Sequence, residues 1–258
     1  MNHRENFAKV KRIVIKIGSS LLTKGGKGLD KIAIAQWVAQ MASLQKSGID
    51  VILVSSGSVA EGVWRLGLKA RPTTLHELQA AAAVGQMGLV RVFDDTFQQH
   101  DLHASQVLLT HDDLSNRQRY LNARSTLLTL LQFGVVPVIN ENDTVATEEI
   151  RFGDNDTLAA LVANLVEADL LLILTDQPGL FTADPSIHSD ATLISQINVN
   201  DERLESMAGE SRSGLGRGGM STKVSAARLA ARSGAATIVA AGATKNVIQA
   251  VLNGDVIG

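Results

Sequence analysis

The chain of 258 residues contains no cysteine, little net charge and no long apolar run. Without cysteine it can form neither a disulfide bond nor a zinc site with cysteine ligands. Its formal net charge of −2 at pH 7 argues against a nucleic-acid-binding protein, which needs a basic face. No apolar run approaches the roughly 18 residues that a membrane-spanning helix requires, so no contact with a membrane is expected.

The N-terminal residues 1–6 are polar and lack the apolar core of a secretion signal. Hydrophobic residues make up 45% of the chain and charged residues 19%, which is typical of a globular domain rather than a disordered one. A chain of this length can bury a large core. We therefore expect a cytoplasmic enzyme, with a non-catalytic binding domain as the alternative.

Short apolar segments alternate with longer segments of helical periodicity. Strands are predicted at residues 13–17, 51–55, 106–109, 135–139, 170–175 and 237–240. Helices are predicted at 30–44, 75–97, 116–131, 157–165 and 221–231, whereas 176–219 is loop-rich. Strands that alternate with helices form parallel sheets covered on both faces. The pattern predicts an α/β fold, a three-layer α/β/α sandwich with a mainly parallel central sheet, and no linker divides the single domain 1–258.

An acidic and amide-rich passage follows the predicted strand 135–139. It comprises residues 140–143 (Asn-Glu-Asn-Asp) and 153–156 (Gly-Asp-Asn-Asp), immediately before a predicted helix. Packing does not require so many Asn and Asp residues, and α/β sheets bind ligands at the carboxyl ends of their strands. Four carboxylates there could bind Mg²⁺ or Ca²⁺: Glu141, Asp143, Asp154 and Asp156. They could instead bind a substrate ammonium group and orient lysines, or act only as caps and turn residues.

Two further segments have the composition of anion sites. Lys16 lies within an apolar strand, where burial of an unpaired ammonium group is unfavourable unless the side chain faces an anion. Gly18 follows it and could donate its backbone N–H to a phosphate. Residues 55–58 (Ser-Ser-Gly-Ser) join a strand to a helix start, which also favours anion binding. The alternatives are an edge-strand lysine with its ammonium group in water and an ordinary serine cap.

A glycine-rich tract, residues 213–219, precedes the last predicted helix. It satisfies the pattern G-x-G-x-x-G, but it follows a polar stretch rather than a buried strand, so a dinucleotide-binding motif is rejected. No Walker A motif occurs. Its N–H groups and Lys223 could bind a polyphosphate, unless the tract is only a flexible loop. Thr175 and Asp176, at the end of another predicted strand, could hydrogen-bond a nucleotide or merely form a turn.

Six segments, in order along the chain, resemble motifs of the amino acid kinase family, and specifically of its members that phosphorylate glutamate. They are residues 16–20 (Lys-Ile-Gly-Ser-Ser), 55–58, 140–143, 153–156, 174–177 (Leu-Thr-Asp-Gln) and 218–223 (Gly-Gly-Met-Ser-Thr-Lys). The combination is highly specific and the resemblance extends over residues 11–258. It implies the fold of that family and ATP-dependent phosphorylation of the γ-carboxylate of L-glutamate, the first step of proline biosynthesis, with Mg²⁺.

The resemblance also implies roles for individual residues. Lys16 and Lys223 would stabilise the transferring phosphoryl group, and Asp156 would position both lysines rather than bind a metal. L-Glutamate would be bound by Ser56, Gly57, Asp143 and Asn155. ATP would be bound by Lys16, Gly18, Thr175, Asp176, Arg217, Gly218, Gly219, Met220, Ser221, Thr222 and Lys223. Residues 1–165 would then form the substrate-binding half and residues 166–258 the nucleotide-binding half.

The family usually has threonine in place of Arg217. Many members carry a C-terminal PUA domain, which we do not expect within residues 1–258. Feedback inhibition by L-proline and a homo-oligomer, a dimer or tetramer, are further expectations, with helices near 80–97 and 116–133 as interfaces. One alternative is a sibling kinase for another carboxylate, a phosphate or a carbamate, against which residues 140–143 and 153–156 argue. The other is a non-catalytic amino-acid sensor, which would be expected to lose Lys16, Asp156 or Lys223.

Overall fold

The computed structural model describes residues 7, 9–23, 25, 27–147, 154–208 and 219–258. Six strands form one parallel sheet in the order β3-β4-β2-β1-β5-β6. Their bounds are β1 Arg12–Ile17, β2 Asp50–Ser55, β3 Ala104–Leu109, β4 Val136–Glu141, β5 Leu170–Thr175 and β6 Ala236–Ala241. Each lies close to a strand predicted from the sequence.

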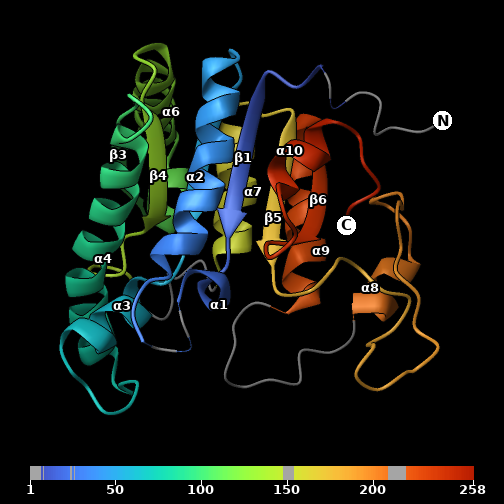
Figure 1. Cartoon of the computed structure of the whole chain (residues 1–258), viewed down its shortest axis with the longest axis horizontal. Coiled ribbons are helices and arrows are strands. Elements are labelled where there is room, and N and C mark those ends of the chain that lie inside the picture. Colours follow the sequence, from blue (N-terminus) through green and yellow to red (C-terminus); the bar gives the residue numbers. More distant parts are fainter. Residues whose placement is uncertain (1–6, 8, 24, 26, 148–153, 209–218) are drawn as a thin grey trace.

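Helices cover both faces of this sheet (Figure 1). On one face pack α2 (Lys31–Lys46), α4 (Leu75–Gln98) and α10 (Val247–Leu252). On the other pack α6 (Arg117–Gln132), α7 (Asn155–Leu165) and α9 (Met220–Ala230). Shorter helices are α1 (Ser19–Leu22), α3 (Ser58–Arg65), α5 (His111–Ser115) and α8 (Arg203–Ala208), the last within the segment predicted to be loop-rich. The predicted three-layer α/β/α sandwich is confirmed.

The alternation of side chains along β1 explains where Lys16 points. Ile13, Ile15 and Ile17 enter the hydrophobic core shared with α2, α4 and α10, whereas Val14 enters the core shared with α7 and α9. Successive side chains of a strand face opposite sides of the sheet, so Lys16 shares the side of Val14. The ammonium group is therefore directed toward the layer that contains α7 and α9.

Capping side chains fix the starts of several helices. Asp30, the N-cap of α2, accepts hydrogen bonds from the backbone N–H groups of Ile32 and Ala33, at 3.1 and 3.2 Å. The start of α10 is capped from another helix, because Oε1 of Gln40 in α2 accepts from the N–H groups of Ile248 and Gln249, at 3.0 and 3.5 Å. Two distant parts of the chain are thereby joined.

Substitution of Gln40 by alanine is expected to lower the free energy of unfolding by about 1 kcal/mol, the usual contribution of an N-terminal cap. The reason is that α10 has no cap of its own, since the preceding residue, Asn246, makes no side-chain cap hydrogen bond. Urea denaturation would measure the change. Gln36→Ala, at an exposed position of the same helix, is the matched control. Equal stabilities of the two variants would contradict the capping role.

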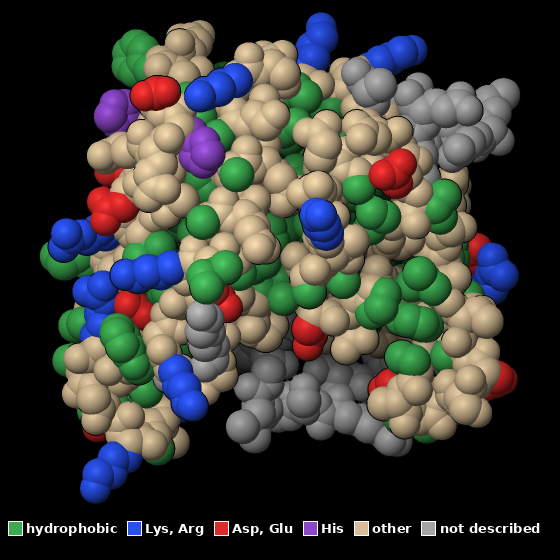
Figure 2. Space-filling view, in the orientation of Figure 1, with side chains coloured by type: hydrophobic (Ala, Val, Ile, Leu, Met, Phe, Trp, Pro, Cys, Tyr) green, Lys and Arg blue, Asp and Glu red, His purple; other side chains and the backbone are tan. Residues whose placement is uncertain are grey.

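The surface combines charges of both signs. On the face shown in Figure 2, Lys and Arg side chains are interspersed with Asp and Glu side chains. In the described parts of the chain, no helix is both long enough and apolar enough to cross a membrane.

Candidate active site

Polar residues lie at the carboxyl ends of four neighbouring strands. Lys16 is the penultimate residue of β1, Ser55 ends β2, Glu141 ends β4 and Thr175 ends β5. Because the strands are parallel, these ends meet along one edge of the sheet, where open α/β sheets bind their ligands. The motifs at these strand ends therefore lie along one edge of the sheet.

Two lysines share one buried carboxylate at this edge. Asp156, in the first turn of α7, has no exposed surface; its Oδ1 lies 2.6 Å from Nζ of Lys16 and its Oδ2 lies 3.1 Å from Nζ of Lys223. The contact with Lys16 is an ion pair between opposite charges. Its geometry is not that of a regular hydrogen bond, and Oδ1 accepts none among the described residues. The hydroxyl of Thr222 lies 2.9 Å from Oδ2. Residues from β1, α7 and α9 therefore meet at one carboxylate.

The charge of Asp156 is maintained by its two partners. Burial by itself raises the pKa of this carboxyl group, but the ammonium groups of Lys16 and Lys223 outweigh burial and hold the pKa below its ordinary value. Asp156 is therefore ionised at neutral pH, and it holds two positive charges close together. Such an arrangement suits a ligand that carries several negative charges.

Asp154 acts as the N-cap of α7, as one alternative reading of the acidic passage predicted. Its Oδ1 accepts a hydrogen bond of 2.7 Å from the N–H of Thr157. Burial raises the pKa of Asp154, and the neighbouring charge of Asp156 raises it further. Within the described residues, no group of three or more His, Cys, Asp or Glu side chains is placed to bind a metal ion. The carboxylates considered as a Mg²⁺ or Ca²⁺ cluster therefore do not form one there.

Asn155 joins three segments on the other side of Asp156. Its Nδ2 lies 2.7 Å from the carbonyl oxygen of Ser55, 2.9 Å from Oγ of Ser56 and 2.9 Å from Oδ1 of Asn140, so its two N–H groups are shared among three acceptors. These acceptors come from the end of β2, the turn after it and the end of β4. Two of the predicted glutamate-binding residues, Ser56 and Asn155, are thus in direct contact.

The turn after β2 leads into α3 and reaches the remaining predicted substrate residues. Gly57 is the N-cap of α3 with φ of +97°, a left-handed conformation that favours glycine, so the alternative of an ordinary serine cap is wrong. Oγ of Ser58 donates to Oδ2 of Asp143 at 3.2 Å. The N-terminus of α3 and Asp143 therefore lie together beside the Asn155 cluster.

On the nucleotide side, the structure brings together most of the predicted residues and corrects one contact. Gly219 is the N-cap of α9, so Met220, Ser221, Thr222 and Lys223 form its first turn, while Arg217 and Gly218 lie outside the described residues. Oγ1 of Thr175 donates to Asp176 at 3.0 Å. The N–H of Gly18 was predicted to bind a phosphate, but it donates instead to the carbonyl oxygen of Leu174, at 3.2 Å.

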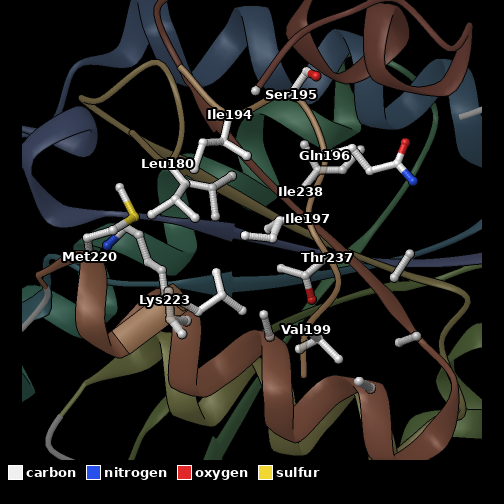
Figure 3. A pocket seen from close by; sticks show the side chains of 18 of the residues that line it. Leu180, Ile194, Ser195, Gln196, Ile197, Val199, Met220, Lys223, Thr237 and Ile238 are labelled. Atoms are coloured by element: carbon white, nitrogen blue, oxygen red, sulfur yellow. The ribbon is translucent and has the colours of Figure 1, made fainter. Parts of the chain in front are cut away.

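A pocket of about 330 Å³ lies beside Lys223, between α9, β6 and residues 194–199. Met220 and Lys223 line it from α9, and Thr237 and Ile238 line it from β6 (Figure 3). Most of the other lining side chains are apolar: Leu180, Ile194, Ile197, Val199 and Val224. An apolar pocket with a few polar groups at its margin is typical of a small-molecule site.

Sequence reasoning gave no role to Ser58 or Gln86, although both belong to the site. Ser58 contacts Asp143, and Gln86 accepts a hydrogen bond of 2.9 Å from Asn140. Ser58 stands within a segment that the sequence marked as an anion site, so its involvement could have been predicted. Gln86 carries no such local signal, because its contact joins two segments that only the fold brings together.

Comparison with known proteins agrees with the fold and the motifs. The model of the amino acid kinase family matches residues 11–241. The glutamate 5-kinase of Methylococcus capsulatus is 63% identical over 258 residues, which cover 100% of this chain and 69% of that protein. The glutamate 5-kinase of Marinomonas sp. is 64% identical over 258 residues, with the same coverage of 100% and 69%.

Solved structures of other kinases share the fold at low sequence identity. The isopentenyl phosphate kinase of T. acidophilum superimposes with a TM-score of 0.66 at 17% identity, covering 96% of this chain and 98% of the other. The UMP kinase of Bacillus anthracis gives a TM-score of 0.64 at 16% identity, covering 96% and 94%. From the family match and the extent of identity, the chain belongs to the amino acid kinase family.

Proposed function

We propose that this chain transfers the γ-phosphoryl group of ATP to the γ-carboxylate of L-glutamate, producing L-glutamyl 5-phosphate and ADP in the first step of proline biosynthesis in the cytoplasm. The observation that carries the proposal is the placement of Lys16 and Lys223 on Asp156, directly beside the cluster around Asn155. The identity of 63% and 64% with glutamate 5-kinases supports the choice of substrate.

The acceptor in this reaction requires no general base. A glutamate side chain has a pKa of about 4.3 and is therefore ionised at neutral pH. The obstacle is repulsion between this carboxylate and the polyphosphate that it must approach. Lys16 and Lys223 reduce the repulsion, and Asp156 keeps their ammonium groups in place. Catalysis then consists of positioning and charge neutralisation, as in other phosphoryl transfers.

The two halves of the chain provide the two substrates' sites in this proposal. Within residues 1–165, L-glutamate is bound by Ser56, Gly57, Asp143 and Asn155. Within residues 166–258, ATP is bound by Thr175, Asp176 and residues 217–223, with Lys16 added from β1. The adenine base of ATP binds in the apolar pocket beside Met220, because most of the side chains that line this pocket are uncharged.

Mg²⁺ is expected to accompany ATP. Both carboxylate oxygens of Asp156 lie within 3.1 Å of lysine nitrogens, and no metal-binding group of three acidic or histidine side chains occurs in the parts of the chain that the structure describes. This arrangement fits an ion held mainly by phosphate oxygens and water, which is how proteins commonly bind Mg²⁺. The ion would neutralise phosphate charge.

Substitution of Asp143 by alanine is expected to raise the KM for L-glutamate about 10- to 100-fold with little change in the KM for ATP. The physical reason is loss of a charge-assisted hydrogen bond to the substrate ammonium group, worth about 1.5–3 kcal/mol. Steady-state kinetics with each substrate varied would measure it. Asp190→Ala, at an exposed position, is the control. An unchanged glutamate KM would refute the substrate role.

The function itself is tested by ADP release from the purified chain. Turnover is expected with L-glutamate and not with L-aspartate, N-acetylglutamate or UMP. Turnover with UMP or N-acetylglutamate instead would favour a sibling kinase, whereas binding of L-glutamate without turnover would favour a sensor.

The same assay with L-proline tests feedback inhibition, which we place at the glutamate site.

We also propose a dimer or tetramer assembled through α4 and α6. Large apolar side chains are exposed on and beside these helices, including Met87 at 72% and Phe133 at 75%. Sedimentation of the wild-type protein would measure the subunit number.

A further inference from the structure

Three side-chain amides form a hydrogen-bonded chain through the substrate site. They belong to Gln86 on α4, Asn140 near the end of β4 and Asn155 at the start of α7. Nδ2 of Asn140 donates to Oε1 of Gln86 at 2.9 Å, and Nδ2 of Asn155 donates to Oδ1 of Asn140 at 2.9 Å. Gln86 and Asn140 are only 7% and 2% exposed. The proposed function gives a role to Asn155 alone.

Two backbone groups determine which way these amides point. The N–H of Glu141 can only donate, and it lies 2.9 Å from Oδ1 of Asn140. The carbonyl oxygen of Ser55 can only accept, and it lies 2.7 Å from Nδ2 of Asn155. With its oxygen fixed in this way, Asn140 must present its nitrogen to Gln86, which therefore offers its oxygen.

This orientation has a consequence at each end of the chain of amides. At one end, Nδ2 of Asn155 is engaged by its three acceptors, and none of the described residues donates to its Oδ1. At the other end, Nε2 of Gln86 is buried without a hydrogen-bond partner among the described residues. An unpaired buried donor costs about 1–3 kcal/mol, so this orientation is held at the expense of stability. A functional requirement for this orientation would explain why the buried Nε2 of Gln86 is left without a partner among the described residues.

We infer that Gln86 is a positioning residue, which acts through Asn140 and together with the backbone groups of Ser55 and Glu141 to hold Asn155 with its carbonyl oxygen available to the ammonium group of the substrate. The inference rests on the proposed function and assigns Asn155 to the α-ammonium group of L-glutamate rather than to its carboxylates. If Asn155 were rotated, it would offer an NH₂ group to a cation. Gln86 also lines a pocket of about 590 Å³ together with Glu141 and Asp143, so acidic side chains lie near the Gln86 end of the chain of amides.

The test compares L-glutamate with glutarate, which has the same two carboxylates and lacks the ammonium group. Gln86→Met retains the length of the side chain and removes the acceptor for Asn140, so that Asn140 and Asn155 are held less firmly, by their remaining contacts alone. The KM for L-glutamate is expected to rise about tenfold, which corresponds to about 1.4 kcal/mol. The KM for ATP and the inhibition constant of glutarate as a competitor of L-glutamate are expected to stay within about twofold of wild type.

Two further variants make the result specific. Gln98→Met, at an exposed position of the same helix, is expected to leave every constant unchanged. Gln86→Glu retains an oxygen for the amide of Asn140 and is expected to keep the glutamate KM near wild type. Its value also decides the case if Gln86→Met does not fold, since a tenfold rise in Gln86→Glu would overturn the inference.

Other outcomes separate this inference from the function on which it rests. A parallel rise in the glutamate KM and the glutarate inhibition constant would indicate general distortion and overturn the positioning role. An unchanged glutamate KM in a folded Gln86→Met protein would do the same. Absence of glutamate phosphorylation by the wild-type protein would instead refute the proposed function.

Discussion

Replacement of Lys223 by methionine is expected to reduce kcat about 10³-fold or more while the protein remains folded. Groups that stabilise the charge of a transferring phosphoryl group contribute about 10²- to 10⁵-fold to turnover. Nζ of Lys223 is held 3.1 Å from Asp156, on the α9 side of the site. Methionine fills a similar space at this position, which is only 5% exposed. Asp156 retains Lys16 at 2.6 Å, so no buried carboxylate is left without a cation.

Lys16→Met should reduce kcat by a similar factor. In this variant Asp156 keeps its ion pair with Lys223, so the buried carboxylate again has a cation beside it. ADP release at saturating substrate concentrations would measure both losses, and circular dichroism with thermal unfolding would establish that the variants are folded. Lys245→Met, at an exposed position, is the matched control and should turn over normally. A folded Lys223→Met or Lys16→Met protein with near-normal kcat would rule out the proposed mechanism.

The layers of the fold could be predicted because each strand carries its own signal. Strands buried on both faces must be apolar at successive positions, so runs such as β5, which is buried throughout, stand out from the periodic helices between them. Lys16 and Asp156 could be marked as candidates by the same reasoning, since a charge within or next to such a run requires a partner. Their pairing follows once parallel strands place both residues at one edge.

The contacts that depend on helix packing could not be predicted in this way. The cap of α10 comes from Gln40, and the partner of Asn140 is Gln86; neither contact leaves a pattern in either local sequence. The N–H of Gly18 was assigned to a phosphate because a glycine follows a strand, yet the neighbouring strand supplies Leu174 as its acceptor. Local sequence indicates which groups are present, whereas the fold determines which of them are already engaged.

Substitution of Gly85 by alanine is expected to destabilise the protein and to weaken glutamate binding together. A Cβ atom at Gly85 would lie 1.8 Å from the carbonyl oxygen of Ser58 and 2.4 Å from the backbone nitrogen of Gly62. Both atoms belong to the backbone of α3, so the clash can be relieved only by separation of α3 from α4. Because α3 begins beside Gly57 and its Ser58 contacts Asp143, the movement would disturb the substrate site.

The sign of the change in the free energy of unfolding distinguishes this clash from an ordinary glycine-to-alanine substitution in a helix. A glycine-to-alanine substitution inside a helix normally stabilises by about 0.5–1 kcal/mol. At Gly85 a loss of about 3 kcal/mol is expected, because overpacking against backbone cannot be relieved by a rotamer change. Gly88→Ala, on the same helix, is the comparison, since its Cβ would meet the guanidinium group of Arg65, a side chain whose displacement strains its ion pair with Glu61 but moves no backbone. Urea denaturation and glutamate kinetics are expected to show a lower free energy of unfolding and a higher glutamate KM for Gly85→Ala than for Gly88→Ala. Equal free energies of unfolding in the two variants, with a wild-type glutamate KM, would show that α3 and α4 separate freely, contrary to the structure.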